Sequence, residues 1–259
     1  MDELNELFRK RVGISKKGRI TFEHLDTVLE KTAKTIPFEN LCIIENRTTD
    51  ITKGNLVNKM LMKNEGGLCY ELNSILYFFL EANGFNVNLV RGVIFNHEAE
   101  DWLTLGRTHV AILLNHENET FLVDTGFGGN LPLRPVPLNG RTITSNNGEF
   151  RVSRMNNKHG DYILEMKIKH KDQDWRIGYT FDSKQPVQEV SEFNEIQKIL
   201  IENEESPFNK NPLVTQLTAK GNKTLTDTTF TEWVDGELKK DKVDNDRFKE
   251  LAKLYFGLE

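Results

Sequence analysis

Cys69 has the sequence setting of a nucleophile. It follows the Gly66-Gly67 pair, and the residues after it predict an amphipathic helix through apolar positions 72, 75, 76, 79 and 80. A thiol in the first turn of a helix lies near unpaired backbone N–H groups and the positive end of the helix dipole, which stabilise the thiolate. This stretch alone predicts a nucleophile and a buried structural cysteine equally well.

Two polar residues at the edges of strand-like apolar runs extend the candidate site. His109 precedes the apolar run 110–114, and Asp124 follows the apolar run 121–123. An imidazole or carboxylate buried without a partner is costly, so each of these side chains is expected to have one. The polar segment 115–119 predicts a hairpin that places the two strands side by side. Cys69, His109 and Asp124 then suit a nucleophile, a base and an orienting carboxylate.

Four motifs of the sequence occur in the order and spacing of one known family. They are Gly-Gly-x-Cys-x-Glu-Leu-Asn at 66–73, Ile-Pro-Phe-Glu-Asn-Leu at 36–41, Thr108-His109, and Val-Asp-x-Gly-Phe-Gly at 123–128. With these motifs the sequence resembles the arylamine N-acetyltransferases over roughly residues 1–135. The last third matches more loosely, through the Ser-Pro-Phe at 206–208 and the segment 251–258.

The resemblance implies a covalent two-step transfer in which Cys69 takes an acetyl group from acetyl-CoA and passes it to an arylamine or arylhydrazine. His109 would remove the proton of the amine, and Asp124 would hold the imidazole. Acetyl-CoA is then a consumed co-substrate, and no metal or tightly held cofactor is expected. The expected partners are therefore coenzyme A and small aromatic amines or hydrazines.

Further site residues follow from the same resemblance. Phe38, Thr108 and Phe127 are expected to bind the acceptor, and Gly126 and Gly128 are expected to leave room for the thiol end of coenzyme A. From sequence alone, Phe38 is equally well an ordinary core residue. Without the resemblance, the glycines after Asp124 are best interpreted as a turn that follows a strand.

One position departs from the family pattern. Arginine is usual directly before the Gly-Gly pair, and this chain has Glu65 there. We expect that arginine to pair with the glutamate of the Pro-Phe-Glu-Asn motif. Here Glu39 would lose its cation and face a second carboxylate, so Glu65→Arg would raise stability.

Two other functions remain open at the level of sequence. A transglutaminase-like or papain-like thiol hydrolase uses the same Cys-His-Asp set, although the motifs around Cys69 favour the transferase. An inactive binding homologue is the second alternative, and Glu65 is the hint for it.

Composition limits the other classes of protein. With 259 residues, a net charge of −5 and no basic run interleaved with aromatic residues, the chain is not expected to bind nucleic acid. Its apolar runs are too short to span a bilayer, and no signal peptide is recognised. The two cysteines, Cys42 and Cys69, form no disulfide framework or zinc-ligand spacing, and no histidines have metal-site spacing. A buried, inert thiol is expected for Cys42, and a cytoplasmic location for the protein.

The elements that must position the site predict an α+β fold in three parts. Residues 1–84 are expected to form an N-terminal helical bundle that carries the nucleophile, with helices at 2–9, 21–34, 55–63 and from position 69. Residues 85–187 alternate like strands and predict a central antiparallel β-barrel or sheet that carries His109 and Asp124. Residues 188–259 predict a C-terminal α/β lid with a helix, two strands around Gly221 and a final helix. The three catalytic candidates would then form a cysteine-protease-like Cys-His-Asp core.

Overall fold

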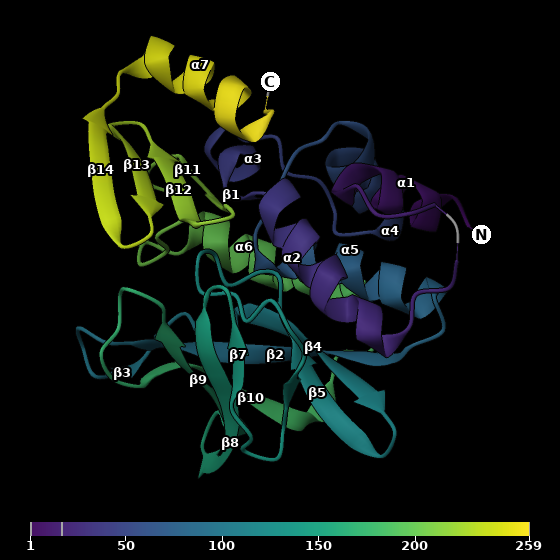
Figure 1. Ribbon diagram of the computed structural model, residues 1–259. Coiled ribbons are helices and arrows are strands. Elements are labelled where there is room, and N and C mark those ends of the chain that lie inside the picture. Colours follow the sequence, from purple (N-terminus) through teal and green to yellow (C-terminus); the bar gives the residue numbers. More distant parts are fainter. Residues whose placement is uncertain (1, 17, 259) are drawn as a thin grey trace.

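A computed structural model describes residues 2–16 and 18–258 of the chain. Figure 1 shows helices packed on one side of a large twisted sheet, with a second sheet covered by the C-terminal helix. The helical elements are α1 (Glu3–Val12), η1 (Phe22–His24), α2 (Leu25–Thr35), α3 (Leu41–Ile44), α4 (Lys53–Leu56), η2 (Val57–Met62), α5 (Cys69–Ala82), η3 (Val190–Glu192), α6 (Phe193–Glu202) and α7 (Asn245–Phe256).

The N-terminal helices bury one continuous apolar core. Phe8 of α1 stacks on Phe79 of α5 with ring centroids 4.2 Å apart, and both side chains are fully buried. The predicted helices at 2–9 and 21–34 are confirmed as α1 and as η1 followed by α2. The short helix predicted at 55–63 is confirmed as a helical segment over 53–62, in which α4 passes into a π-helix, η2, that the apolar spacing did not predict. In η2 the N–H of Lys63 bonds the carbonyl of Asn58 five residues earlier, and such wide turns leave no signal in apolar spacing.

The larger sheet is antiparallel and carries the candidate histidine. Among the described residues its path is β6-β5-β4-β2-β10-β9-β8-β7, with β3 paired to β2. Contacts between β6 and β8 bring its two ends together. Its strands are β2 (Asn86–Asn96), β3 (Asp101–Trp102), β4 (His109–His116), β5 (Glu119–Val123), β6 (Val136–Pro137), β7 (Ile143–Ser145), β8 (Gly148–Asn157), β9 (Gly160–Ile168) and β10 (Arg176–Pro186).

The hairpin predicted between the two polar candidates is confirmed. β4 and β5 are antiparallel neighbours, with Ile112 opposite Val123. Glu117 and Asn118 connect them with φ values of 46° and 66°, which is the backbone of a type I′ turn. This register places His109 at the start of β4 and Asp124 just past the end of β5, on the side that faces α5.

The second sheet is larger than the two strands predicted around Gly221. Its order within the described residues is β1-β11-β12-β13-β14, formed by β1 (Phe38–Glu39), β11 (Leu213–Leu217), β12 (Gly221–Thr226), β13 (Thr229–Val234) and β14 (Glu237–Lys242). All residues of β14 are exposed, so this edge strand lacks the apolar alternation by which strands are recognised. The run Lys239–Lys242 is solvated, as its charge implies. α7 covers the sheet through Leu251, Ala252 and Phe256 (Figure 1).

The three-part division at 84 and 187 stays a prediction, and its outermost residues, Met1 and Glu259, lie outside the described ones. Two segments pack away from their expected part. Phe193 and Ile196 of α6 belong to the apolar core of the helical part, and β1 pairs with β11 of the second sheet. Side-chain packing therefore assigns these two segments to different parts of the molecule than the order of helices and strands along the chain does.

Candidate active site

The Gly-Gly turn before Cys69 is glycine because neighbouring atoms leave no room for a side chain. A Cβ on Gly66 would lie 2.1 Å from the carbonyl oxygen of Pro37, and one on Gly67 would lie 2.7 Å from Oε2 of Glu71. The chain can therefore pass between these groups only without side chains at both positions. Cys69 is the first residue of α5, as the apolar spacing predicts.

Cys69, His109 and Asp124 converge on one buried site. Nε2 of His109 lies 2.8 Å from Oδ2 of Asp124, and Cys69 is among the groups that raise the pKa of the imidazole. Because Nε2 faces the carboxylate, Nδ1 is the nitrogen left for the sulfur. The thiol also approaches the carbonyl oxygen of Thr108, with a sulfur–oxygen distance of 3.4 Å. The exposed fractions of Cys69, His109 and Asp124 are 8%, 1% and 2%, so bulk water is largely excluded.

The charges of His109 and Asp124 are coupled. Burial lowers the pKa of His109, but the neighbouring Asp124 carboxylate outweighs burial and raises that pKa to about 10. Burial also raises the pKa of Asp124, but the imidazole and the hydrogen bonds to the carboxylate hold that pKa below its usual value. An imidazolium–carboxylate pair is therefore the form expected at neutral pH.

Asp124 has partners that the sequence analysis did not single out. Oδ2 also accepts a hydrogen bond from the hydroxyl of Tyr179 at 2.8 Å, and Oδ1 accepts from Nδ2 of Asn73 at 2.9 Å and from the N–H of Gly126 at 2.7 Å. Asn73 follows Cys69 by one helical turn and ends the motif at 66–73. Its position in the sequence could therefore have indicated a role at the site. Tyr179 is 55 residues from Asp124 and belongs to an ordinary alternating strand, so nothing in the sequence linked the two.

Asn73 ties α5 to the hairpin as well as to Asp124. Its Nδ2 donates to the carbonyl of Val110 at 2.7 Å, and its Oδ1 accepts from the N–H of Thr125 at 2.9 Å. A Cβ on Gly126 would lie 2.6 Å from the Cα of Cys69, so α5 and the loop after β5 touch through this glycine. The space beside Gly126 is thus filled by the protein, whereas the nearest atom to a Cβ on Gly128 would be 3.8 Å away, on Thr215.

Aromatic side chains form one wall of the site. Phe127 lies with its ring centroid 5.2 Å from that of His109 and meets Tyr179 edge-on, also at 5.2 Å. Phe38 forms a bridge to Gly67 through its backbone, and its ring meets Phe208 edge-on at 5.7 Å. The half-buried Phe208 belongs to the Ser-Pro-Phe segment of the sequence, and the sequence did not indicate its contact with Phe38.

A cavity of about 540 Å³ lies between the loop after β5 and strands β11–β13. Part of its lining is basic and comes from distant segments of the chain: Lys34, Lys169, Lys171 and Lys220. Lys220 pairs with Asp235, which also lines the cavity, and Lys34 pairs with Glu30, so the positive charge that would suit an anionic ligand comes mainly from Lys169 and Lys171.

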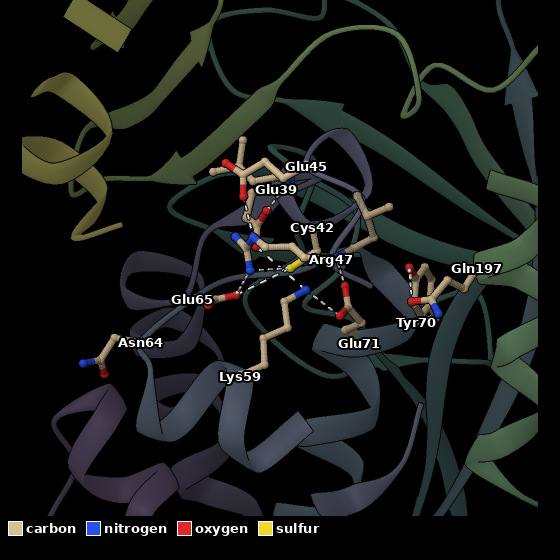
Figure 2. A network of polar contacts seen from close by, with 12 residues as sticks. Glu39, Cys42, Glu45, Arg47, Lys59, Asn64, Glu65, Tyr70, Glu71 and Gln197 are labelled. Atoms are coloured by element: carbon tan, nitrogen blue, oxygen red, sulfur yellow. Dashed lines mark hydrogen bonds and ion pairs between the residues drawn. The ribbon is translucent and has the colours of Figure 1, made fainter. Parts of the chain in front are cut away.

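Glu65 and Glu39 each have a cationic partner. The expectation that Glu39 would lack a cation is therefore wrong. Nη1 of Arg47 lies 2.8 Å from Oε2 of Glu65, and Nζ of Lys59 lies 3.9 Å from Oε1 of Glu39 (Figure 2). Each carboxylate is therefore paired with a cation from another part of the sequence. Neither cation belongs to a sequence motif that would have indicated the pairing. The buried Cys42 lies beside Arg47, and burial raises the pKa of its thiol to about 12, which agrees with an inert cysteine.

Residues 2–16 and 18–258 contain no group of three or more His, Cys, Asp or Glu placed to hold a metal ion. Among the same residues, no helix combines the length and apolar character needed to cross a membrane.

Comparison with known proteins identifies the family. A family model described as N-acetyltransferase matches residues 21–259. The uncharacterized acetyltransferase YvcN of Bacillus subtilis (strain 168) is 36% identical, with 98% of each chain covered. The crystal structure of arylamine N-acetyltransferase C from Bacillus anthracis superposes with a TM-score of 0.95 at 38% identity and covers 100% of both chains.

A second solved structure differs from this chain at the carboxylate. The NAT3 arylamine N-acetyltransferase of Bacillus cereus superposes with a TM-score of 0.94 at 39% identity, over 100% of this chain and 99% of that one. That protein is described as having a unique Cys-His-Glu catalytic triad, whereas an aspartate, Asp124, contacts His109 here. The α+β fold class and the family resemblance seen in the sequence are confirmed. The chain belongs to the arylamine N-acetyltransferase family and is an acyltransferase.

Proposed function

We propose that this enzyme transfers an acetyl group from acetyl-CoA to an aromatic amine or hydrazine through an acetyl-Cys69 intermediate. The observation that carries the proposal is the buried convergence of Cys69, His109 and Asp124, with Nε2 of His109 on the carboxylate and Nδ1 left for the sulfur. The comparisons favour this reaction over a thiol hydrolase with the same three residues. The finding that Glu65 is paired with Arg47 removes the hint of an inactive homologue.

In the first step, the thiolate of Cys69 attacks the carbonyl carbon of the acetyl thioester. The new sulfur–carbon bond forms as the bond to the sulfur of coenzyme A breaks, and the departing thiolate takes up the proton that the imidazolium of His109 gives up, which leaves the imidazole neutral for the second step. The raised pKa of His109, about 10, keeps the imidazole protonated at neutral pH, where it stabilises the neighbouring thiolate. One thioester replaces another, so the step is nearly balanced in energy.

In the second step, the nitrogen of the acceptor attacks acetyl-Cys69 and the sulfur leaves. Acetylation removes the negative charge that the sulfur can carry, and that charge contributes to the raised pKa of His109. The pKa of the imidazole therefore falls in the acetyl-enzyme, and Nδ1 can accept the proton that the amine loses. Asp124 holds the imidazole in place through both steps.

The aromatic wall supports an aromatic acceptor. Phe38, Phe127 and Phe208 would stack on its ring, and Phe127 already contacts His109. Weakly basic aromatic amines are neutral at pH 7, so their nitrogen is ready to attack. Thr108 would contribute through its carbonyl oxygen, which lies beside the sulfur of Cys69.

We assign the phosphates of acetyl-CoA to the basic cavity beside the site. Its lysines offer charge to these groups, and its volume of about 540 Å³ suits a large ligand. Gly128 would leave the passage toward Cys69 open, whereas Gly126 acts in helix packing instead. Both cysteines are free thiols, and a reducing cytoplasm is the compartment in which Cys69 stays one.

Mass spectrometry of the intact protein tests this function. Incubation with acetyl-CoA should add one acetyl group to Cys69, and an aromatic amine should remove it and yield the acetylated amine. Cys69→Ser should abolish both events and Cys42→Ser should preserve them. Consumption of acetyl-CoA without amine product would indicate a hydrolase, and no adduct in wild type would sink the proposal.

A further inference from the structure

Lys59 lies in η2 next to the turn that precedes Cys69, with a side chain only 12% exposed (Figure 2). Its Nζ lies 2.5 Å from Oε1 of Glu71 and 3.9 Å from Oε1 of Glu39. Burial lowers the pKa of Lys59, but these two carboxylates outweigh burial and raise it. A buried ammonium therefore lies between two carboxylates that come from β1 and α5.

Both carboxylate residues hold the turn that presents the thiol. Oε2 of Glu71 accepts a hydrogen bond from the N–H of Leu68, directly before Cys69, at 3.0 Å. Leu68 is the N-cap of α5 and has no side-chain group for this role, so Glu71 supplies the cap. The N–H of Glu39 donates to the carbonyl of Gly67 at 3.0 Å. Glu71 thus binds the turn at the N–H of Leu68, and Glu39 binds it at the carbonyl of Gly67.

We infer that Lys59 is a positioning residue for Cys69, because its ammonium lies between Glu71 and Glu39, reduces the repulsion between their carboxylates and so keeps the turn in the shape that places the thiol near His109. The inference rests on the proposed function in taking Cys69 as the nucleophile. Without the cation, two buried carboxylates would repel each other, since their side chains are 8% and 1% exposed. Gly67 packs directly against Glu71, so a displaced carboxylate must move the turn.

The other ionisable groups around Lys59 do not replace it. Arg47 is already bound to Glu65 and to Glu45, and the thiol of Cys42 stays neutral. Lys59 and Lys63 both line a small cavity of about 70 Å³, but Lys63 is exposed and makes no ion pair among the described contacts. The cation of this cluster thus comes from η2, whereas the family resemblance expects it directly before the Gly-Gly pair.

Alkylation of Cys69 by iodoacetamide tests the inference without any use of acetyl-CoA. The rate is followed by peptide mapping between pH 6 and 9 in wild type, Lys59→Met, Lys59→Arg and the control Lys63→Met. The cavity of about 70 Å³ beside Lys59 has room for the larger guanidinium. Thermal unfolding of each variant is measured in parallel.

Lys59→Met should slow alkylation on the order of tenfold at pH 8, since small displacements of reacting groups are costly. The ratio of the wild-type rate to the variant rate should grow with pH, because protonation of one carboxyl relieves the repulsion at pH 6. The Lys59→Arg variant should keep most of the wild-type alkylation rate, because it keeps the positive charge. The Lys63→Met variant should be alkylated at the wild-type rate. Wild-type rates in Lys59→Met at every pH, or a loss that arginine does not restore, would overturn the inference.

A double variant keeps the test decisive if Lys59→Met does not fold. Glu71→Gln retains an oxygen for the N–H of Leu68 but removes the charge that Lys59 neutralises. In that background, Lys59→Met should change the alkylation rate less than twofold, and a tenfold change would refute action through Glu71. Failure of wild type to become acetylated by acetyl-CoA would count against the proposed function and leave this comparison standing.

Discussion

At the scale of single residues, the site depends on the buried contact between His109 and Asp124, from which solvent is largely excluded. Asp124 accepts hydrogen bonds from His109, Tyr179, Asn73 and the backbone of Gly126, so its carboxylate is fixed before any substrate arrives. Preorganised partners of this kind lower the cost of the charge changes that a thiol nucleophile requires. The charge of His109 follows from this arrangement, because the same carboxylate raises its pKa.

Asp124→Asn should separate charge from shape. The amide keeps the size of the carboxylate, but the pKa of His109 should fall from about 10, because the anion that raises it is gone. The imidazolium is then lost at neutral pH, and alkylation of Cys69 should require a higher pH than in wild type. Activity should fall by a factor on the order of 10³–10⁴. Identical alkylation profiles would show that Asp124 does not set the charge of the pair.

Glu65→Arg is now expected to lower stability, contrary to the expectation from sequence. The substitution replaces the attraction between Glu65 and Arg47 by repulsion. The Arg47 side chain is 39% exposed, so solvent screening limits the loss to under about 1 kcal/mol. Chemical denaturation measures it, and Glu65→Gln should lose less because it removes the attraction without adding repulsion. A stabilised Glu65→Arg protein would mean that the arginine finds another anion.

At the scale of elements, α5 and the β4–β5 hairpin form the site because their backbones come very close. Asn73 bonds both the strand and the loop after it, and Gly126 allows the contact with Cys69. Cys69, the first residue of α5, then lies against Gly126 and beside the carbonyl oxygen of Thr108, the residue before His109. Packing between a helix and a hairpin therefore creates the geometry that neither element has alone.

Gly126→Ala tests this contact. The new Cβ would lie 2.6 Å from the Cα of Cys69, and a backbone atom cannot move aside without shifting α5. We expect a loss of stability of about 1–3 kcal/mol and slower alkylation of Cys69. Gly129→Ala is the matched control, because its Cβ would meet the nearest atom at 3.5 Å, on the side chain of Asn222. Equal melting temperatures for the two variants would contradict the contact.

At the scale of the whole molecule, the second sheet is bound to the helical part by β1 and by the residue after it. Nδ2 of Asn40 donates to the carbonyls of Phe208 and Asn211, both at 2.9 Å, and its Oδ1 accepts from the N–H of Leu213 at 2.7 Å. These bonds hold the segment that places Phe208 against Phe38. We propose on this basis that the C-terminal part closes the site as one unit with β1.

Asn40→Ala should loosen that connection. Three partly buried hydrogen bonds are lost, which is expected to cost about 2–3 kcal/mol. Limited proteolysis should cut within 203–212 sooner than in wild type, and the KM for an aromatic amine should rise as Phe208 loses its place. The exposed Asn139, changed to alanine, serves as the control and should behave like wild type in both measurements. Unchanged proteolysis in Asn40→Ala would argue against this role.

Local patterns in the sequence determined much of this protein. The start of α5 at Cys69, the hairpin and the α+β class follow from apolar spacing and turn residues, which depend on neighbours a few positions away. Strand-like apolar runs with a polar residue at one edge indicated His109 and Asp124, the family motifs supported both, and the structure brings them together with Cys69. Glycine at 66, 67 and 126 was visible in the motifs, although the atoms that demand it were not.

Only the tertiary structure decided which charges meet. Lys59 reaches Glu71 across 12 residues and a π-helix, Arg47 reaches Glu65 across 18, and Tyr179 reaches Asp124 across 55. No periodicity links such pairs, because each depends on how separate elements pack and on side chains long enough to cross between them. For the same reason the exposed strand β14 escaped detection, since a strand stabilised by its neighbour's backbone needs no apolar pattern of its own.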